Sequence, residues 1–230
     1  MKNKIISLIL YFISFLSILF YLYILFINRI SINPLLILLY LLIICFLTYF
    51  GGYFWTLYNK DDKNIIYRLN IIIWFILYVI LLLNMTFLNT YFFRNGFIIV
   101  KWNKVVLYDY YYNVVNFIPF KMIIKFIVKL INHEMELSMF IRNIFGNFIA
   151  CMPFAFFLPR LFRKENNIKT FLITMFIIVS IIEITQFITL SGTFDIDDYI
   201  LNISGAYFMF NILKMKKINL LIDKILKKNS

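Results

Sequence analysis

The residues best suited to chemistry are three carboxylates, Asp195, Asp197 and Asp198, which stand between two strongly apolar stretches. Polar and ionisable side chains are costly in membrane-spanning sequence, so they are candidates for a functional site. Carboxylates with amide oxygens nearby suit two tasks. They can hold a hard cation, or they can receive the polar end of a ligand.

Further polar residues lie at helical spacing on the neighbouring segments: Asn143 with Asn147, Glu183 with Gln186, and Asn202 with Asp198. Residues three or four positions apart share one face of a helix. Counting helical rise from the ends of the predicted spans places all these groups within about 12 Å of the outer membrane surface. The sequence therefore predicts one polar site, built from three helices: Asn143, Asn147, Glu183, Gln186, Asp195, Asp197, Asp198 and Asn202.

Structural roles for the same groups stay open. Asp195 or Asp197 could cap a helix, because a carboxylate suits the positive end of the helix dipole. The amides could join helices inside the membrane. Glu183 favours a functional role, because a carboxyl below the interface costs about 2–3 kcal/mol. If the site holds a divalent cation, the candidate ligands are Asp195, Asp198 and Glu183; no other cofactor is expected.

The composition is that of an integral membrane protein. The chain is 63% hydrophobic and only 15% charged, with a mean hydropathy of +0.88. A soluble surface needs far more polar side chain than this. The net charge of +12 arises from Lys and Arg in the short gaps between apolar runs and in the tail. That is the pattern of membrane topology signals, which argues against nucleic acid as a partner.

Apolar runs of sufficient length predict an all-α, polytopic bundle of about six transmembrane helices, near 5–27, 35–58, 71–92, 139–158, 168–190 and 197–213. The first of them follows Lys2 and Lys4 and has no small-residue cleavage site, which is typical of an uncleaved anchor. Most Lys and Arg lie on the inner side if both termini are cytoplasmic, so this multi-pass orientation in the cell membrane is favoured.

The long segment before the fourth span contains a second notable pattern. Lys121, Lys125 and Lys129 recur every four residues within the apolar stretch 121–131. Such a basic, amphipathic helix either lies in the headgroup plane or is an ordinary surface connector. The lone His133 near Glu134 is expected to be solvated rather than catalytic.

Four motifs in this order resemble the VanZ-like family of bacterial membrane proteins: Asn116–Phe120, Asn143–Asn147 followed by Pro153 and Pro159, Glu183–Gln186, and Phe194–Gly205. The resemblance covers roughly 71–213. It divides the chain into an N-terminal two-helix addition at 1–70, a VanZ-like helical core at 71–213 and a basic cytoplasmic tail at 214–230. It also implies a relation to proteins of resistance to glycopeptide antibiotics such as teicoplanin.

Three functions follow from these patterns. The favoured one is a non-enzymatic envelope protein whose outer-leaflet polar pocket binds the headgroup of a membrane lipid or a lipid-linked cell-wall precursor. A glycopeptide is a further candidate partner. The alternative is a metal-assisted membrane enzyme acting on a lipid phosphate. The sequence offers no Ser/His or Cys/His pairing for catalysis. A small-solute transporter is third, because no inverted repeat is visible.

Overall fold

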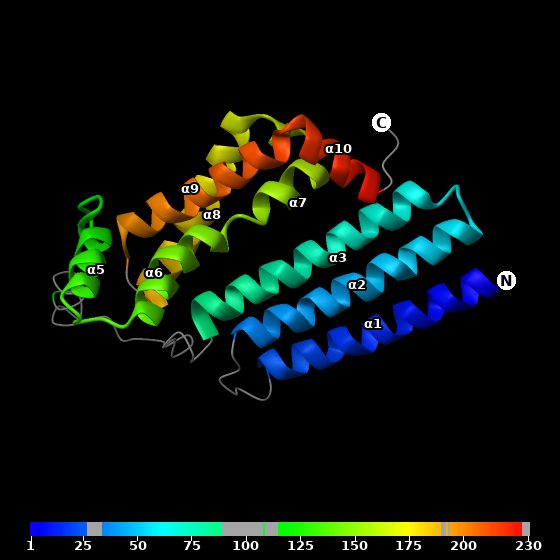
Figure 1. Ribbon diagram of the computed structural model, residues 1–230, viewed down its shortest axis with the longest axis horizontal. Coiled ribbons are helices and arrows are strands. Elements are labelled where there is room, and N and C mark those ends of the chain that lie inside the picture. Colours follow the sequence, from blue (N-terminus) through cyan, green and yellow to red (C-terminus); the bar gives the residue numbers. More distant parts are fainter. Residues whose placement is uncertain (27–33, 89–107, 109–114, 190–191, 193, 227–230) are drawn as a thin grey trace. The chain divides into compact units, whose positions relative to one another are not determined.

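The computed structural model describes residues 1–26, 34–88, 108, 115–189, 192 and 194–226. Within these ranges the chain folds into helices, and its only β-type pairing there is one isolated bridge. The chain divides into two compact units (Figure 1). Unit 1 comprises 1–95 together with 223–230, and unit 2 comprises 96–222.

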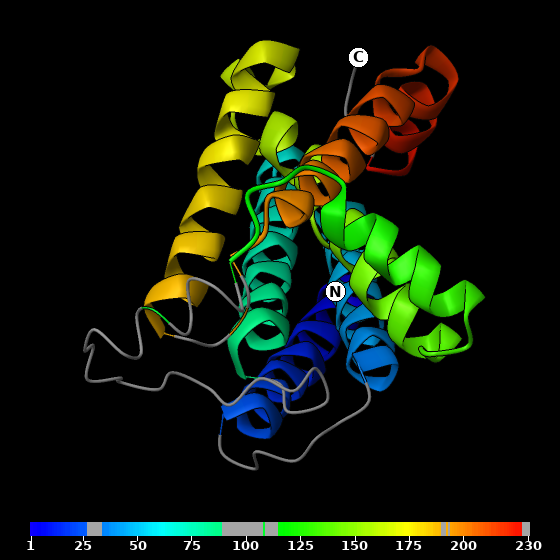
Figure 2. The same ribbon diagram turned by 90° about the vertical axis from the view of Figure 1, so that its left-hand side faces the viewer.

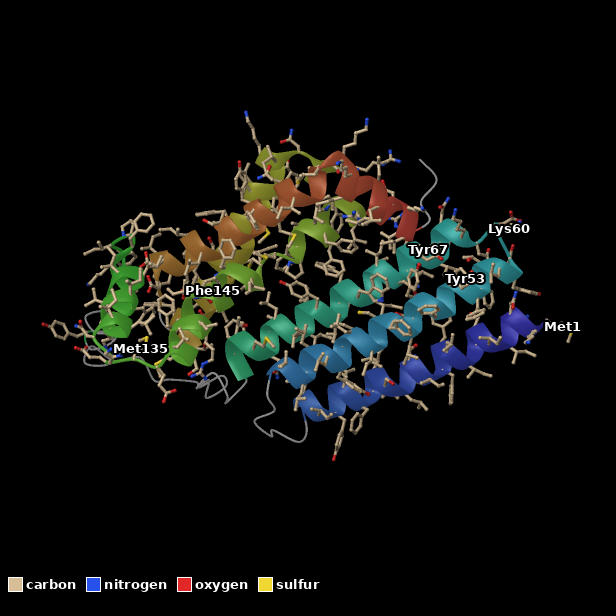
Figure 3. The ribbon with its side chains drawn as sticks, in the orientation of Figure 1. Met1, Tyr53, Lys60, Tyr67, Met135 and Phe145 are labelled. Carbon is tan, nitrogen blue, oxygen red and sulfur yellow. The ribbon has the colours of Figure 1, made fainter. Side chains whose placement is uncertain are left out.

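Unit 1 is an assembly of three long helices: α1 (Lys2–Phe26), α2 (Pro34–Tyr58) and α3 (Lys63–Leu83), the last ending in a π-helical turn, η1 (Asn84–Leu88). α2 packs against both α1 and α3. The buried core between them includes Tyr21, Ile44 and Leu77. Apolar side chains also stand out from the faces of α1 and α2 turned away from this core (Figure 3). Lipid tails can cover such faces, whereas water cannot do so without a large free-energy cost.

Polar side chains join the three helices from inside. Ser7 Oγ donates to the Gly51 carbonyl oxygen at 2.7 Å, and Asn70 Nδ2 donates to the Thr48 carbonyl oxygen at 3.0 Å. Trp74 Nε1 donates to Thr48 Oγ1 at 2.8 Å. Each such bond between membrane helices typically contributes about 0.6 kcal/mol. These residues have hydrogen-bond partners within unit 1 and serve its packing.

Unit 2 is organised around α9 (Ile196–Lys214). The other elements are α5 (Lys121–Ile131), α6 (Leu137–Ala150), α7 (Phe154–Leu161), the 3₁₀ turn η3 (Arg163–Asn166), α8 (Ile168–Thr189) and α10 (Lys216–Ile225), whose last residues group with unit 1. α9 packs against α6, α7 and α8, and its first turns also meet α5. Figure 2 shows α9 between α8 on one side and α6 on the other.

The fourth predicted span, 139–158, is two helices rather than one. α6 ends at Ala150, and α7 begins at Phe154 after a turn in which Met152 N–H donates to the Ile149 carbonyl at 3.0 Å. Pro153 explains the break, because proline has no N–H to donate and its ring collides with the carbonyl four residues earlier. A proline inside the predicted span should have indicated this interruption.

By length and composition, five stretches are apolar enough to cross a membrane: Lys2–Leu25, Leu35–Tyr58, Lys63–Phe87, Leu137–Leu161 and Ile168–Thr189. The fourth of them consists of α6, the turn after it and α7. They correspond to the first five predicted spans. The sixth, 197–213, is helical as α9, but the carboxylates in its first turn reduce its hydrophobicity. α3 begins at Lys63, eight residues before the predicted span, and packs with α1 and α2 in unit 1. The division placed at 70/71 from sequence therefore falls inside α3.

Candidate functional site

The turn before α9 is joined to a distant segment by backbone and side-chain hydrogen bonds. Asn116 N–H donates to the Phe194 carbonyl at 2.9 Å, and Ile196 N–H donates to the Asn116 carbonyl at 3.0 Å. Asn116 Nδ2 also donates to Asp195 Oδ1 at 2.7 Å. The same oxygen accepts the Asp197 N–H at 2.9 Å, so Asp195 is the N-cap of α9. The sequence left a capping role open for Asp195, and in the structure Asp195 caps α9.

The side chain of Asp197 lies at the N-terminus of α5, although α5 precedes Asp197 by more than seventy residues in the sequence. Its Oδ2 accepts the N–H groups of Met122 at 2.8 Å and Ile123 at 3.1 Å, and its Oδ1 accepts that of Phe120. The side chain is only 2% exposed. The first N–H groups of a helix have no partner inside the helix, and they favour a negative charge. Asp197 therefore caps α5 from another element.

Asp198 connects α9 to α6. Asn147 Nδ2 donates to Asp198 Oδ1 across the two helices. Asn202, one turn further along α9, donates from its Nδ2 to the Asp198 backbone carbonyl at 2.8 Å. A carboxylate accepting an amide N–H makes a charge-assisted hydrogen bond, which is stronger than a neutral one. The Asn147–Asp198 pair thus holds the first turn of α9 against α6.

α8 contributes the fourth acid. Glu183 is 2% exposed, and its Oε2 accepts the Asp195 N–H at 3.4 Å. Gln186 is buried as well, one turn further along α8. Unit 2 therefore brings Glu183 of α8 to the turn that leads into α9.

The predicted residues separate into two groups. Asn147, Glu183, Asp195, Asp197, Asp198 and Asn202 meet at one end of unit 2, with Gln186 buried close by along α8. Asn143 does not join them, because its Nδ2 donates to the Met139 carbonyl of its own helix at 2.8 Å in an exposed setting. Helical spacing alone could not reveal that Asn143 bonds to its own backbone. A ligand-binding role for the other residues stays a prediction.

Two partners of the acids were missing from the predicted site: Asn116 and the first turn of α5. Asn116 belongs to the first of the four family-like motifs, but its residue type does not place it beside the acids. Its position, five residues before a Lys-bearing amphipathic helix and three before Pro119, was the available signal. For the contact between Asp197 and α5 the sequence offered no signal, because the donors are backbone N–H groups, which every helix has at its N-terminus.

Burial raises the pKa of the Asp195 carboxyl. Two hydrogen bonds oppose that shift, from the Asp197 N–H and from Asn116 Nδ2. The nearby Asp197 carboxylate raises the pKa further, while Lys121 lowers it. The Asp195 carboxyl, inside this hydrogen-bonded turn, therefore has a higher pKa than a free aspartate.

The candidate metal ligands suggested by the sequence are Asp195, Asp198 and Glu183. In the structure they do not form a group of ligands around a common point. Across the described ranges, no group of three or more His, Cys, Asp or Glu side chains lies close enough to hold a metal ion. The donors around Asp197 are backbone amides. The arrangement as it stands orders helix ends, and divalent-metal binding remains a prediction.

α5 carries three distinct faces. One face is half-buried against α6 and α9 through Met122, Ile123, Phe126 and Leu130. A second face is apolar yet exposed: Ile124, Ile127, Val128 and Ile131. The third is an edge of Lys121, Lys125 and Lys129, spaced one helical turn apart. An apolar strip bordered by lysines is the arrangement of a helix that lies at a membrane surface.

α5 ends at Ile131, and His133, two residues later, adopts a left-handed conformation with φ of 57°. Glu134 N–H donates to the Lys129 carbonyl at 2.8 Å, and His133 N–H donates to the Leu130 carbonyl at 3.2 Å. This is the Schellman pattern that terminates a helix. His133 is exposed, which fits the expectation of a solvated histidine.

Comparison with protein families gives one match. The family model described as VanZ/LLP1 covers residues 75–217, more than half of the chain. It starts inside α3 and ends in the first turn of α10, and so contains the whole polar site. No curated protein and no solved structure matches the sequence.

Proposed function

The chain belongs to the VanZ/LLP1 family, and on that premise we propose that it is a multi-pass protein of the bacterial cell membrane that binds the phosphate of an envelope lipid or lipid-linked cell-wall precursor. The binding surface is the lysine edge of α5, at the outer face of the membrane. The buried acids at the start of α9 position α5. The protein is a binding protein rather than an enzyme.

The observation that carries this proposal is the attachment of α5. Its first turn is fixed by Asp197, while its apolar strip is exposed. On the lysine edge, Lys121 and Lys125 are exposed and Lys129 is half-buried. A helix that is anchored at one end and exposed along its apolar strip needs an apolar medium on that side. Acyl chains near the headgroups provide it, and lysines at the border then lie level with lipid phosphates.

The acids support binding indirectly. Asp195 and Asp197 use their oxygens on Asn116 and on backbone amides, and Asp198 bonds to Asn147. With these partners, the acids give α5 a defined position relative to α6 and α9. A defined position lowers the entropy lost when a phosphate is bound by several lysines at once.

Photo-cross-linking tests this directly. The purified protein in nanodiscs would be irradiated with a photoactivatable polyprenyl phosphate, and the modified peptides would be mapped. We expect modification within 115–131, and its loss in the triple variant Lys121→Gln, Lys125→Gln, Lys129→Gln. The matched control carries the same three changes at Lys216, Lys217 and Lys224 and should keep the modification. Cross-links that map elsewhere, or that survive the α5 changes, would contradict the proposal.

Glycopeptide tolerance is the cellular counterpart. Strains that lack or overproduce the protein would be profiled against teicoplanin and other glycopeptides. Overproduction should raise tolerance, and the α5 triple variant should lose the increase at unchanged membrane levels. Equal susceptibility of all strains would remove the resistance role and leave lipid binding to be judged by the cross-linking.

Thermal unfolding with Mg²⁺, Mn²⁺ or a chelator separates binding from metal-assisted catalysis. The proposal expects the midpoint of unfolding to be the same in all three conditions, because the acid oxygens are engaged by protein N–H groups. A rise with one of the ions that is lost in Asp198→Asn would favour the metal enzyme instead.

A further inference from the structure

The far end of unit 2 carries a second amphipathic helix, α10 (Lys216–Ile225). Four of its five apolar residues follow the spacing of a single helix face: Ile218, Leu221, Ile222 and Ile225. Leu220 lies on the polar side of the helix. No residue of α10 is fully buried, and Leu221 is 57% exposed. Lys217 and Lys224 border the apolar strip, and Lys216 lies on the opposite face. We infer that α10 lies on the inner membrane surface and binds anionic phospholipid headgroups there.

The first step is the distance from the polar site. α9 has 19 residues, which at about 1.5 Å per residue span roughly 28 Å. The hydrocarbon core of a bilayer is about 30 Å thick. α5 meets the first turn of α9, and α10 starts immediately after its last turn. If α5 lies at the outer headgroups, the start of α10 lies at the inner ones.

The second step is the change of direction between the two helices. Met215 leaves the helical conformation, with φ of −59° and ψ of 128°, and α10 resumes at Lys216. A chain that continued straight would carry the apolar strip of α10 into water. A turn at the surface instead lets the strip rest on the acyl chains.

The third step is charge. At the same end of unit 2, Lys214 Nζ donates to Asn166 Oδ1 at 2.8 Å, which brings η3 to the end of α9. The basic residues of unit 2 exposed there come from η3, from the start of α8 and from the first turn of α10: Arg163, Lys164, Lys169, Lys216 and Lys217. The acid of η3, Glu165, is buried. Clusters of four to eight basic residues next to a membrane helix attract anionic lipid.

Spin-label accessibility tests the inference on the full-length protein. Nitroxides would be attached at Leu221→Cys, on the apolar strip, and at Asn219→Cys, on the polar face, in a Cys45→Ala, Cys151→Ala background. The protein would be reconstituted in phosphatidylcholine, alone or with an equal part of phosphatidylglycerol. We expect position 221 to be reached by oxygen and position 219 by an aqueous relaxant. Phosphatidylglycerol should lower the aqueous access of position 221 several-fold.

The charge variant Lys216→Gln, Lys217→Gln, Lys224→Gln should abolish that effect of phosphatidylglycerol, whereas the α5 triple variant should not. Equal aqueous access at 219 and 221 in both lipid mixtures would overturn the surface placement. The aqueous access of position 221 could also be equally low in both lipid mixtures and unchanged by the lysine substitutions. That result would overturn the recognition of anionic lipid.

A label-free measurement covers the case in which the cysteine variants do not fold. Phosphatidylglycerol added to the protein in detergent should raise the midpoint of thermal unfolding, and the α10 triple variant should lose part of that rise. An undiminished rise would contradict the inference. Because the α10 changes leave the polyprenyl phosphate cross-link at α5 untouched, failure here is distinguishable from failure of the proposed function.

Discussion

Asn116 and Asp195, 79 positions apart in the sequence, are joined by a side-chain hydrogen bond of 2.7 Å and by the backbone bridge beside it. Together these bonds attach the segment before α5 to the turn before α9. Asp197 then fixes the first turn of α5 itself. The placement of the lysine edge is therefore set by the start of α9, and this dependence leads to the predictions below.

Asp197→Ala should release α5. Three backbone N–H groups lose their acceptor, and an unpaired buried donor costs about 1–3 kcal/mol. We expect a lower midpoint of thermal unfolding in detergent and faster proteolysis after the lysines of α5. The control Asp61→Ala removes an exposed carboxylate in unit 1 and should change neither. Unchanged proteolysis of α5 in Asp197→Ala would show that its anchor lies elsewhere.

Two glycines give opposite predictions. A Cβ at Gly205 would collide with the carbonyl of Phe148 in α6, whereas a Cβ at Gly146 would meet nothing within 4 Å. Gly205→Ala must push α9 from α6, at a cost of about 1–3 kcal/mol. Gly146→Ala should leave stability unchanged or raise it by up to about 1 kcal/mol, because alanine favours helix. Thermal unfolding of both variants measures the difference, and equal stabilities would refute the close approach.

Asp195 should make stability depend on pH. Burial raises its pKa in the folded protein, so between the ordinary Asp value of about 4 and the raised value the folded state keeps a proton that the unfolded state has released. Stability from this group therefore falls as pH rises through that window. Asp195→Asn retains an oxygen that can accept from Asn116 but cannot titrate. In this variant the midpoint of thermal unfolding should fall less as the pH rises. If the midpoint depends on pH in the same way in the variant and in the unchanged protein, Asp195 is not the titrating group.

The pair Asn147 and Asp198 can be exchanged. Asp198→Asn weakens the hydrogen bond to α6, because the acceptor loses its charge. We expect this variant to lower both the unfolding midpoint and the polyprenyl phosphate cross-link at α5. The double variant Asn147→Asp, Asp198→Asn restores a charged partner to an amide and should recover much of both. If the double variant is no better than the single one, other contacts of Asp198 dominate.

Helix positions could be predicted from sequence because they depend on local pattern. Apolar length places the helices, and spacings of three, four and seven put the acids on shared faces. The lysine edge of α5 followed in the same way from Lys121, Lys125 and Lys129.

What could not be predicted depends on contacts between distant segments. Gly205 lies against the backbone of α6, whereas Gly146 faces open space, and nothing in the sequence around the two glycines separates them. Nothing in the sequence around Asp197 says that its partners are the backbone amides of α5, which are the same in every helix. Asn143 and Asn147 share a spacing and a residue type, yet only Asn147 faces α9. Rotation of α6 about its axis, set by packing, decides between them.

The lysine edge of α5 must face the cell exterior if it is to meet an outer-leaflet phosphate. The most direct test is the labelling of Lys125→Cys by a membrane-impermeant maleimide on intact cells, in the background without native cysteines, with Lys217→Cys as the inner-side reference. Position 125 should be labelled before permeabilisation, and position 217 only after it. Labelling of position 125 that requires permeabilisation would contradict the outer placement and the lipid-binding role built on it.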